Sequence, residues 1–157
     1  KMKYCMMILL FLVVGCVSPA RDEQSDVKNI EETEQEAVAA LEELGAGINK
    51  DKEGKVIGVF LSAKPLTDAS LVHLKGLTTL EELNLCETQI TDAGLVHLKE
   101  LKNLTFLSVA YTQITDVGLV HLKGLTKLEK LELLGVKPSD AGVAELQKAL
   151  PNCEITR

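Results

Sequence analysis

Three histidines, His73, His97 and His121, recur at intervals of 24 residues. Imidazole nitrogens are frequent zinc ligands, so a repeated histidine raises the hypothesis of a metal site. A shared ion needs every ligand nitrogen within about 2 Å, whereas neighbouring helical segments pack about 8–10 Å apart. We therefore expect solvated or half-buried histidines, with no bound metal and no other cofactor.

Four aspartates follow a threonine or a serine at the same interval: Asp68, Asp92, Asp116 and Asp140. A row of carboxylates could bind calcium. Each aspartate, however, precedes a short apolar stretch with helical spacing, where a carboxylate can accept hydrogen bonds from the first free backbone N–H groups. Because this interpretation explains every copy without a metal, we expect helix caps here.

A pair of carboxylates is the remaining catalytic hypothesis. Adjacent parallel strands would place Glu132 beside Glu154 at a strand spacing of about 4.8 Å. That spacing is close to the ~5–5.5 Å between the carboxyl groups of retaining glycosidases. A catalytic pair also needs a cleft that excludes water, and the chain has no insertion that would build one. The sequence contains no nucleophile elbow and no phosphate-binding glycine loop. We therefore predict that the protein is not an enzyme.

These residues recur because one phrase of 24 residues is written three times, from Thr67, Thr91 and Thr115, with a shorter copy from Ser139. Self-similarity at a fixed period of this size indicates a solenoid, in which no unit buries its apolar face alone. Within each copy the leucines follow the pattern L-x-x-L-x-L-x-x-T-x-I.

This pattern resembles the leucine-rich repeat family, which carries Asn or Cys where this chain has Thr88 and Thr112. The T-D-x-G-L opening is similar to that of the cysteine-containing branch and of related short bacterial repeat proteins. Over residues 56–157 the resemblance implies an α/β solenoid of about five coils, with a parallel concave sheet and short convex helices. We expect the two threonines to bond the turn backbone. The strands are expected near residues 56–61, 80–85, 104–109, 128–133 and 152–155.

Residues 33–55 are expected to cover the open end of the first coil, because a terminal unit must hide the core that a neighbour otherwise buries. Thr33 and Glu36 form a capping box, and Gly45 stands where a helix ends. A hairpin is predicted over residues 48–61. The apolar residues of the predicted helix are Ala37, Val38, Leu41 and Leu44.

Residues 1–15 have the features of a secretory signal peptide, with a basic start, an apolar run and Gly15 before Cys16. The run is too short to span a bilayer, which needs about 20 apolar residues. Val13 to Cys16 resembles a bacterial lipobox, which implies that Cys16 is diacylated and becomes the mature N-terminus. An ordinary signal peptide that contains a cysteine is the alternative. Lys1 is unusual as a translated start, so we expect Met2 or another start.

The chain is acidic, with a formal net charge of −6 that becomes −8 once Lys1 and Lys3 are removed. Much of this charge lies between Arg21 and Glu36, which contain seven acidic and two basic residues. Residues 16–32 have few apolar side chains and are predicted to form a flexible tether. No basic stripe for phosphates is visible, so we expect no nucleic-acid partner.

Two cysteines, Cys86 and Cys153, remain after the signal peptide and Cys16. They are expected three coils apart, at roughly 14 Å for about 4.8 Å per strand. A disulfide needs Cα atoms within about 7 Å, so no bridge is expected. Cys153 aligns with core leucines such as Leu131 and is expected to be buried, whereas Cys86 is expected to be partly exposed.

Outward positions on the concave sheet vary from copy to copy, because the repeated leucines point inward and alternate residues face outward. Exposed aromatic residues are common anchors of protein interfaces, although a phenylalanine can also merely cover its neighbours. The candidate binding residues on this face and its edge are Phe60, Glu82, Asn84, Phe106, Ser108, Tyr111, Lys130 and Glu132.

The sequence thus predicts a lipid-anchored, extracytoplasmic module, without catalysis, that binds a protein or peptide on its concave face. By resemblance to lipoprotein sorting rules, Val17 in place of aspartate favours an outer membrane over an inner one. The alternative is a structural envelope protein whose repeats pack laterally without a specific ligand. The identity of the partner and the oligomeric state stay open.

Overall fold

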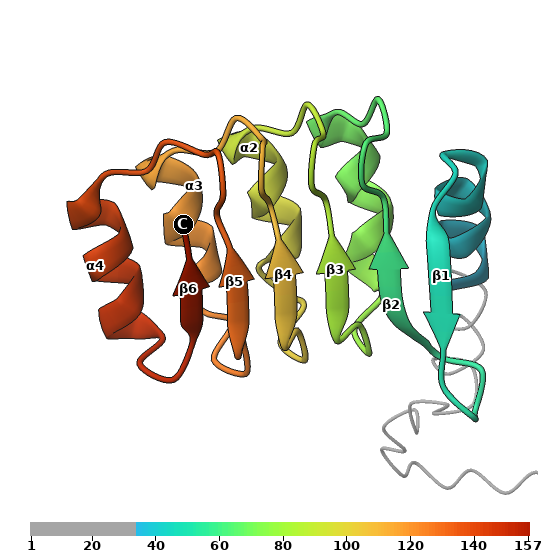
Figure 1. The fold of residues 1–157 in the computed structure, drawn as a ribbon. Helices are drawn as coiled ribbons and strands as arrows, with labels where there is room; N and C mark the ends of the chain where they lie inside the picture. Colours follow the sequence, from blue (N-terminus) through green and yellow to red (C-terminus); the bar gives the residue numbers. More distant parts are fainter. Residues whose placement is uncertain (1–33) are drawn as a thin grey trace, which may run out of the picture.

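The computed structural model describes residues 34–157. The predicted signal peptide, the acylation site Cys16, the tether and Thr33 lie outside this described part. Six strands form one sheet in the order in which they occur in the sequence (Figure 1). The strands are β1 (Gly47–Lys50), β2 (Val56–Phe60), β3 (Glu82–Asn84), β4 (Phe106–Ser108), β5 (Lys130–Glu132) and β6 (Glu154–Thr156).

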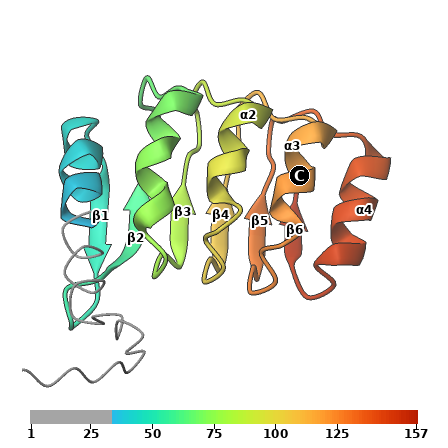
Figure 2. The same cartoon turned by 180° about the vertical axis from the view of Figure 1, so that it is seen from behind.

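Helices cover one face of the sheet and leave the other open, as Figures 1 and 2 show from the two sides. After β2 each strand is preceded by a helical segment, and all pairs from β2 to β6 are parallel. The predicted solenoid of parallel strands and short helices is confirmed. The helical segments are η1 (Asp68–Gly76), α2 (Asp92–Leu95), η2 (Val96–Leu98), α3 (Asp116–Leu122) and α4 (Asp140–Ala149).

One continuous core runs between the sheet and the helices. Leu83, Leu107 and Leu131 stand opposite one another in adjacent strands, and all three are fully buried. The predicted strands were longer than the observed ones, because regular pairing covers three residues per coil before the chain bends into turns.

The register between β5 and β6 differs from the predicted alignment of the last strand. Leu131 stands opposite Ile155, not Cys153, and Glu132 stands opposite Thr156, so the proposed pairing of Glu132 with Glu154 is wrong. The pairing keeps its 24-residue offset up to the last strand, which places Glu154 beside Lys130.

Cys153 is nevertheless buried and free, and Cys86 is free and half-buried, as predicted. Burial raises the pKa of the Cys153 thiol to about 11, so this thiol stays protonated and behaves as a small apolar group.

The repeated aspartates do not cap their own helices, and this prediction is wrong. The caps are the residues before them: the side chains of Thr91, Thr115 and Ser139 accept hydrogen bonds from backbone N–H groups in the first turn. Asp92 instead accepts two hydrogen bonds from the next coil, from the backbone N–H of Thr115 (2.7 Å) and from its hydroxyl (2.6 Å). Asp68 holds Thr91 in the same way, and Asp116 holds Ser139.

This paired contact, here called the inter-coil clasp, explains the glycine in T-D-x-G. A Cβ at Gly94, Gly118 or Gly142 would overlap the clasping aspartate of the preceding coil. The first copy has Ser70 at this position, and the residue one period before Asp68 is Leu44, so no aspartate has to be accommodated there. The motif is therefore a steric and hydrogen-bonding device that joins neighbouring coils.

Buried threonines form a second repeated contact. The hydroxyls of Thr88 and Thr112 donate to the carbonyl oxygens of Leu85 (2.7 Å) and Val109 (2.5 Å), which confirms their predicted turn-bonding role. Val136 occupies the equivalent position in the third copy and packs against the core.

The N-terminal cap has the predicted form. Residues 34–43 are helical, and Val38 and Leu41 pack against the core. The helix is followed by Gly45 at a positive φ of 79°, a conformation that favours glycine. The antiparallel hairpin of β1 and β2 follows. None of the helices in residues 34–157 is long and apolar enough to cross a membrane.

Candidate functional site: the open face of the sheet

The open face is the side of the sheet opposite the helices (Figure 1). Strand register brings the predicted outward residues into two rows that run across the coils. Tyr111 lies beyond them, in the turn after β4. The first row is Gly58, Glu82, Phe106, Lys130 and Glu154, and the second is Phe60, Asn84, Ser108, Glu132 and Thr156.

Phe106, Lys130 and Glu132 form one cluster on this face. The Lys130 ammonium lies 5.7 Å from the centroid of the Phe106 ring and 2.8 Å from a carboxylate oxygen of Glu132. The hydrogen bond from Lys130 lowers the pKa of Glu132, and the same contact raises the pKa of Lys130. Both groups are partly exposed, so solvent screens the ion pair and it contributes little to stability. Its effect is to hold the ammonium over the ring.

Ser108 was predicted to contact a partner, but its side chain is not accessible. It lies in the outward row but is only 1% exposed, because its neighbours cover this short side chain. The Ser108 hydroxyl also lowers the pKa of the Glu132 carboxyl group, after the larger effect of Lys130. Ser108 therefore supports the cluster and is not free to contact a partner.

Phe60 is half-buried, and its ring lies over the backbone of Gly58: a Cβ there would stand 3.1 Å from the ring atom Cε2. Asn84 accepts a hydrogen bond from the backbone N–H of Cys86 (3.0 Å), which fixes the turn after β3. Glu82 is exposed between the two aromatic positions. These three residues lie on the open face, as predicted.

Tyr111 stands at the edge of the open face with 59% of its surface exposed. Its backbone has a positive φ of 55°, as do Ala63 and Glu87 at the same place in earlier coils. The ring lies against Gly135, where a Cβ would overlap it. Leu134 beside it is also exposed and was not among the predicted contacts, because its position is occupied by small residues in the earlier copies.

The histidine row lies on the helical side, and all three rings are half-buried. Within residues 34–157 no three His, Cys, Asp or Glu side chains are grouped so that they could hold a metal ion. The Nδ1 atom of His97 is buried without a hydrogen-bond partner in the described residues.

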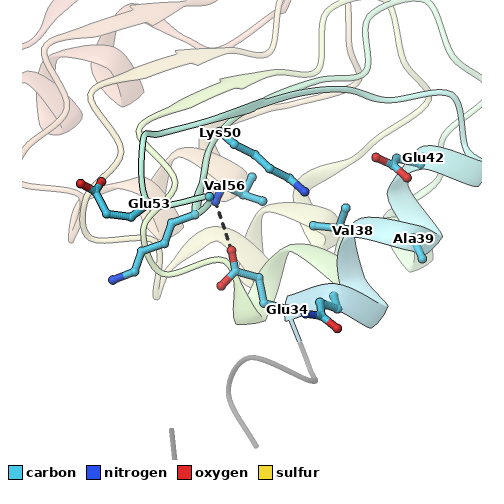
Figure 3. A pocket seen from close by; sticks show the side chains of 10 residues that line it. Glu34, Val38, Ala39, Glu42, Lys50, Glu53 and Val56 are labelled. Carbon is cyan, nitrogen blue, oxygen red and sulfur yellow. Dashed lines mark hydrogen bonds between the residues drawn. The ribbon is translucent and has the colours of Figure 1, made fainter. Parts of the chain in front are cut away.

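A groove of about 470 Å³ separates the N-terminal helix from the hairpin (Figure 3). Glu34, Glu42 and Lys50 line it together with Glu53 and Val56, so acidic, basic and apolar side chains are mixed. The groove belongs to the cap at one end of the solenoid and does not extend onto the two rows of the open face.

Comparisons with known proteins agree with this architecture. A family model described as "Leucine Rich repeat" matches residues 76–99 and 100–122. An internalin (inlF) from Listeria monocytogenes is 25% identical over 78% of this chain and 34% of its own, with a TM-score of 0.53. The search of curated proteins finds no match.

Two further solved structures cover less of the chain. Internalin C2 (inlC2) from Listeria monocytogenes is 34% identical over 54% of this chain and 34% of its own, with a TM-score of 0.44. A leucine-rich-repeat protein from Leptospira interrogans is 24% identical over 55% of this chain and 27% of its own, with a TM-score of 0.42. The chain spans about a third of the length of the internalin structures (34%).

The architecture and the family match together show that the chain folds as a leucine-rich-repeat solenoid. Proteins of this kind generally mediate protein–protein interactions and are typically scaffolds without enzymatic activity, because stacked repeats present one extended surface.

Proposed function

We propose that this protein is a lipid-anchored module of the cell envelope that binds a protein or peptide on the open face of its sheet, without catalysis. The observation that carries the proposal is the contrast between repeated and variable positions. Leu83, Leu107 and Leu131 repeat one residue in the core, whereas the neighbouring outward row changes from Glu82 to Phe106 to Lys130. Variation from coil to coil on the uncovered side is what a specific contact surface requires.

The aromatic side chains supply the anchors of this surface. Phe60 and Phe106 are half-buried, so each ring is held by the fold and still presents one side to a partner. Aromatic residues that are already ordered lose little entropy on binding, and such residues dominate interface energetics. Tyr111 extends the same surface to the edge of the sheet.

The size of the surface limits the partner. Five parallel strands at about 4.8 Å spacing span only about 20–25 Å. This length suits a peptide or one face of a small domain. Glu82 and Lys130 place opposite charges in one row of the open face. A partner with complementary charges would therefore bind in one position along this row.

Cys16 provides the membrane attachment in this proposal, with the acidic segment 16–32 as tether and an extracytoplasmic, preferentially outer-membrane location. The T-D-x-G-L opening supports assigning the repeats, as part of this proposal, to a bacterial branch related to the cysteine-containing type. Cys16→Ser should abolish acylation and release the protein from membranes, because no helix of residues 34–157 is long and apolar enough to cross a membrane and the apolar run of residues 6–14 is too short to span one. An unmodified mature N-terminus at another residue, seen by mass spectrometry, would contradict the anchor.

The partner surface is tested by cross-linking in intact cells followed by affinity purification of the anchored protein. Wild type is compared with Phe60→Ala/Phe106→Ala, and the matched control is Val117→Ala/Val120→Ala, which removes exposed apolar surface from the helical side. A partner captured by wild type and control but lost with the phenylalanine variant supports the open face. Loss with the valine variant alone would move the contact to the helical side.

Lateral packing without a specific ligand is the second candidate. Three exposed valines on the helical side favour it: Val72, Val117 and Val120. Concentration-dependent self-association in sedimentation experiments that disappears in Val117→Ala/Val120→Ala would support this structural role over the binding role.

A further inference from the structure

Five lysines gather along one edge of the solenoid, where the helical segments end and the next strands begin. This set, here called the lysine edge, comes from three successive turns that lie side by side in Figures 1 and 2. Four of the side chains are exposed and Lys123 is half-buried. The sequence shows no basic stripe because these residues are dispersed over more than two repeats. The lysine edge consists of Lys75, Lys99, Lys102, Lys123 and Lys127.

The lysine edge is partly compensated by acidic side chains. The three turns, residues 75–81, 99–105 and 123–129, contain Glu81, Glu100 and Glu129 beside the five lysines, which leaves a formal excess of two positive charges. The ion pairs within the described residues are Lys130–Glu132, Lys148–Glu145 and Arg157–Asp140, and none uses these five lysines.

Two of the five lysines contact neutral acceptors. Lys127 donates to the side-chain oxygen of Asn103 (2.7 Å), and Lys102 lies near the carbonyl oxygen of Gly124 (3.4 Å). Helix dipoles favour cations at the ends of helices, which accounts for Lys75, Lys99 and Lys123. Lys102 and Lys127 lie beyond the helices, so the dipole does not explain them.

The opposite edge of the sheet carries both signs. The clasping aspartates Asp68, Asp92 and Asp116 and Glu87 lie there together with Lys64 and Lys137. The five lysines of the lysine edge lie at the other end, where the parallel strands begin.

The chain enters the domain at the lysine edge. Glu34 accepts a hydrogen bond from the backbone N–H of Val56 (3.1 Å), which fixes the first described residue beside the start of β2 (Figure 3). Parallel strands begin at the same edge of a sheet, so this point and the lysine-bearing turns lie at one end of the molecule (Figure 1). Whatever holds Cys16 is thus connected to the domain from the side of the lysines.

We propose that the lysine edge lies against an anionic lipid surface, with the strands upright on the membrane and the open face turned sideways. The inference rests on the acyl anchor proposed at Cys16. Basic side chains near an anionic membrane each strengthen attachment about fivefold. Val72 and Val120, each three residues before a lysine and exposed, add apolar contacts for the interfacial region. In this orientation the rows of Phe60 and Phe106 stay accessible to a partner.

Vesicle flotation of the full chain tests this orientation. Wild type is compared with Lys99→Glu/Lys123→Glu on the lysine edge and with Lys64→Glu/Lys137→Glu on the opposite edge, which changes net charge by the same amount. Vesicles contain phosphatidylcholine alone or with about one third phosphatidylglycerol. The quantity compared is the increase in partitioning caused by phosphatidylglycerol, so any contribution of the N-terminal apolar run cancels. Thermal melting confirms that all three proteins are folded.

We expect phosphatidylglycerol to increase the partitioning of wild type and of the control variant, and high salt to remove this increase. In the lysine-edge variant the increase should be smaller by at least about tenfold. Equal losses in both variants, or none in either, overturn the proposal. Binding of wild type to duplex DNA but not to phosphatidylglycerol vesicles also overturns it and makes the edge a nucleic-acid surface. Failure of acylation at Cys16 is measured separately by mass spectrometry, so the anchor and the edge can fail independently.

Discussion

The same coils build two regions of the molecule, the inter-coil clasps and the open face. The residues of the clasps repeat from coil to coil, whereas those of the open face vary. At the clasps three junctions use nearly the same chemistry, with an aspartate, a threonine or serine, and a glycine in each. On the open face no two coils present the same side chains. The difference indicates that repeated residues hold the coils together, while the variable residues are free to define what the protein binds.

The largest expected effect is in the core that both regions share. Leu107→Ala should lower the free energy of unfolding by about 2–5 kcal/mol, because a fully buried leucine is replaced by a cavity. Urea denaturation monitored by circular dichroism measures it. His97→Ala is the comparison and should cost much less than Leu107→Ala, because the His97 ring is only half-buried. A large loss at His97, or zinc-dependent melting, would show that the histidine row has a structural role.

The open face should affect binding and leave stability nearly unchanged. Phe60→Ala/Phe106→Ala should weaken partner binding by at least about 2 kcal/mol, the scale of interface hot spots. Titration calorimetry with the captured partner measures this change, and melting curves check the fold. Reversing the charge at Glu132 should mainly alter association rates, in a salt-dependent way. If the phenylalanine variant binds normally, the contact surface lies elsewhere.

The clasps should behave in the opposite manner, with an effect on stability and none on partner recognition. Gly118→Ala introduces a Cβ that overlaps Asp92 and should cost about 1–3 kcal/mol of stability. Gly76→Ala is the matched control, because no atom lies within 4 Å of a Cβ at that position. Equal effects at both glycines would show that the inter-coil clasp does not require a residue without a Cβ at position 118.

The smallest effect is expected in the pH dependence of stability. Hydrogen bonds from Ser139, first from its hydroxyl and then from its backbone N–H, lower the pKa of Asp116 in the folded protein. The stabilisation is therefore present above the unfolded-state pKa and is lost as pH falls through the lower folded-state pKa. Urea midpoints measured from pH 6 downward should fall less steeply for Asp116→Asn than for wild type. Parallel curves for the two proteins would contradict the clasp.

The repeat period was sufficient to predict the solenoid, the N-terminal cap and the threonine contacts, because each depends on residues close in sequence or in one register. The role of the aspartates was not predictable in the same way. Asp92 precedes its own helix by sequence, and only the stacking of coils reveals that its nearest donors belong to Thr115. Spacing alone cannot distinguish a local cap from a contact one period away.

The open face was predicted in outline for the same reason, since alternation assigns outward positions but not their accessibility. Ser108 is outward and yet covered, because burial depends on the sizes of its neighbours. The lysine edge was not predicted from the sequence. Lys75 and Lys127 are separated by 52 positions and lie on the same edge only because the turns stack.

The clasp also bears on how such a chain can change length. A unit that begins at Thr91 contains both halves of a junction: Thr91 and Gly94 receive the preceding aspartate, and Asp92 holds the following threonine. Asp140, the fourth aspartate of the series, forms an ion pair of 2.7 Å with Arg157 in place of a clasp. In-frame duplication of one internal unit would therefore add a coil whose two new junctions are already complementary, and gene duplication could lengthen the binding surface without any further substitution.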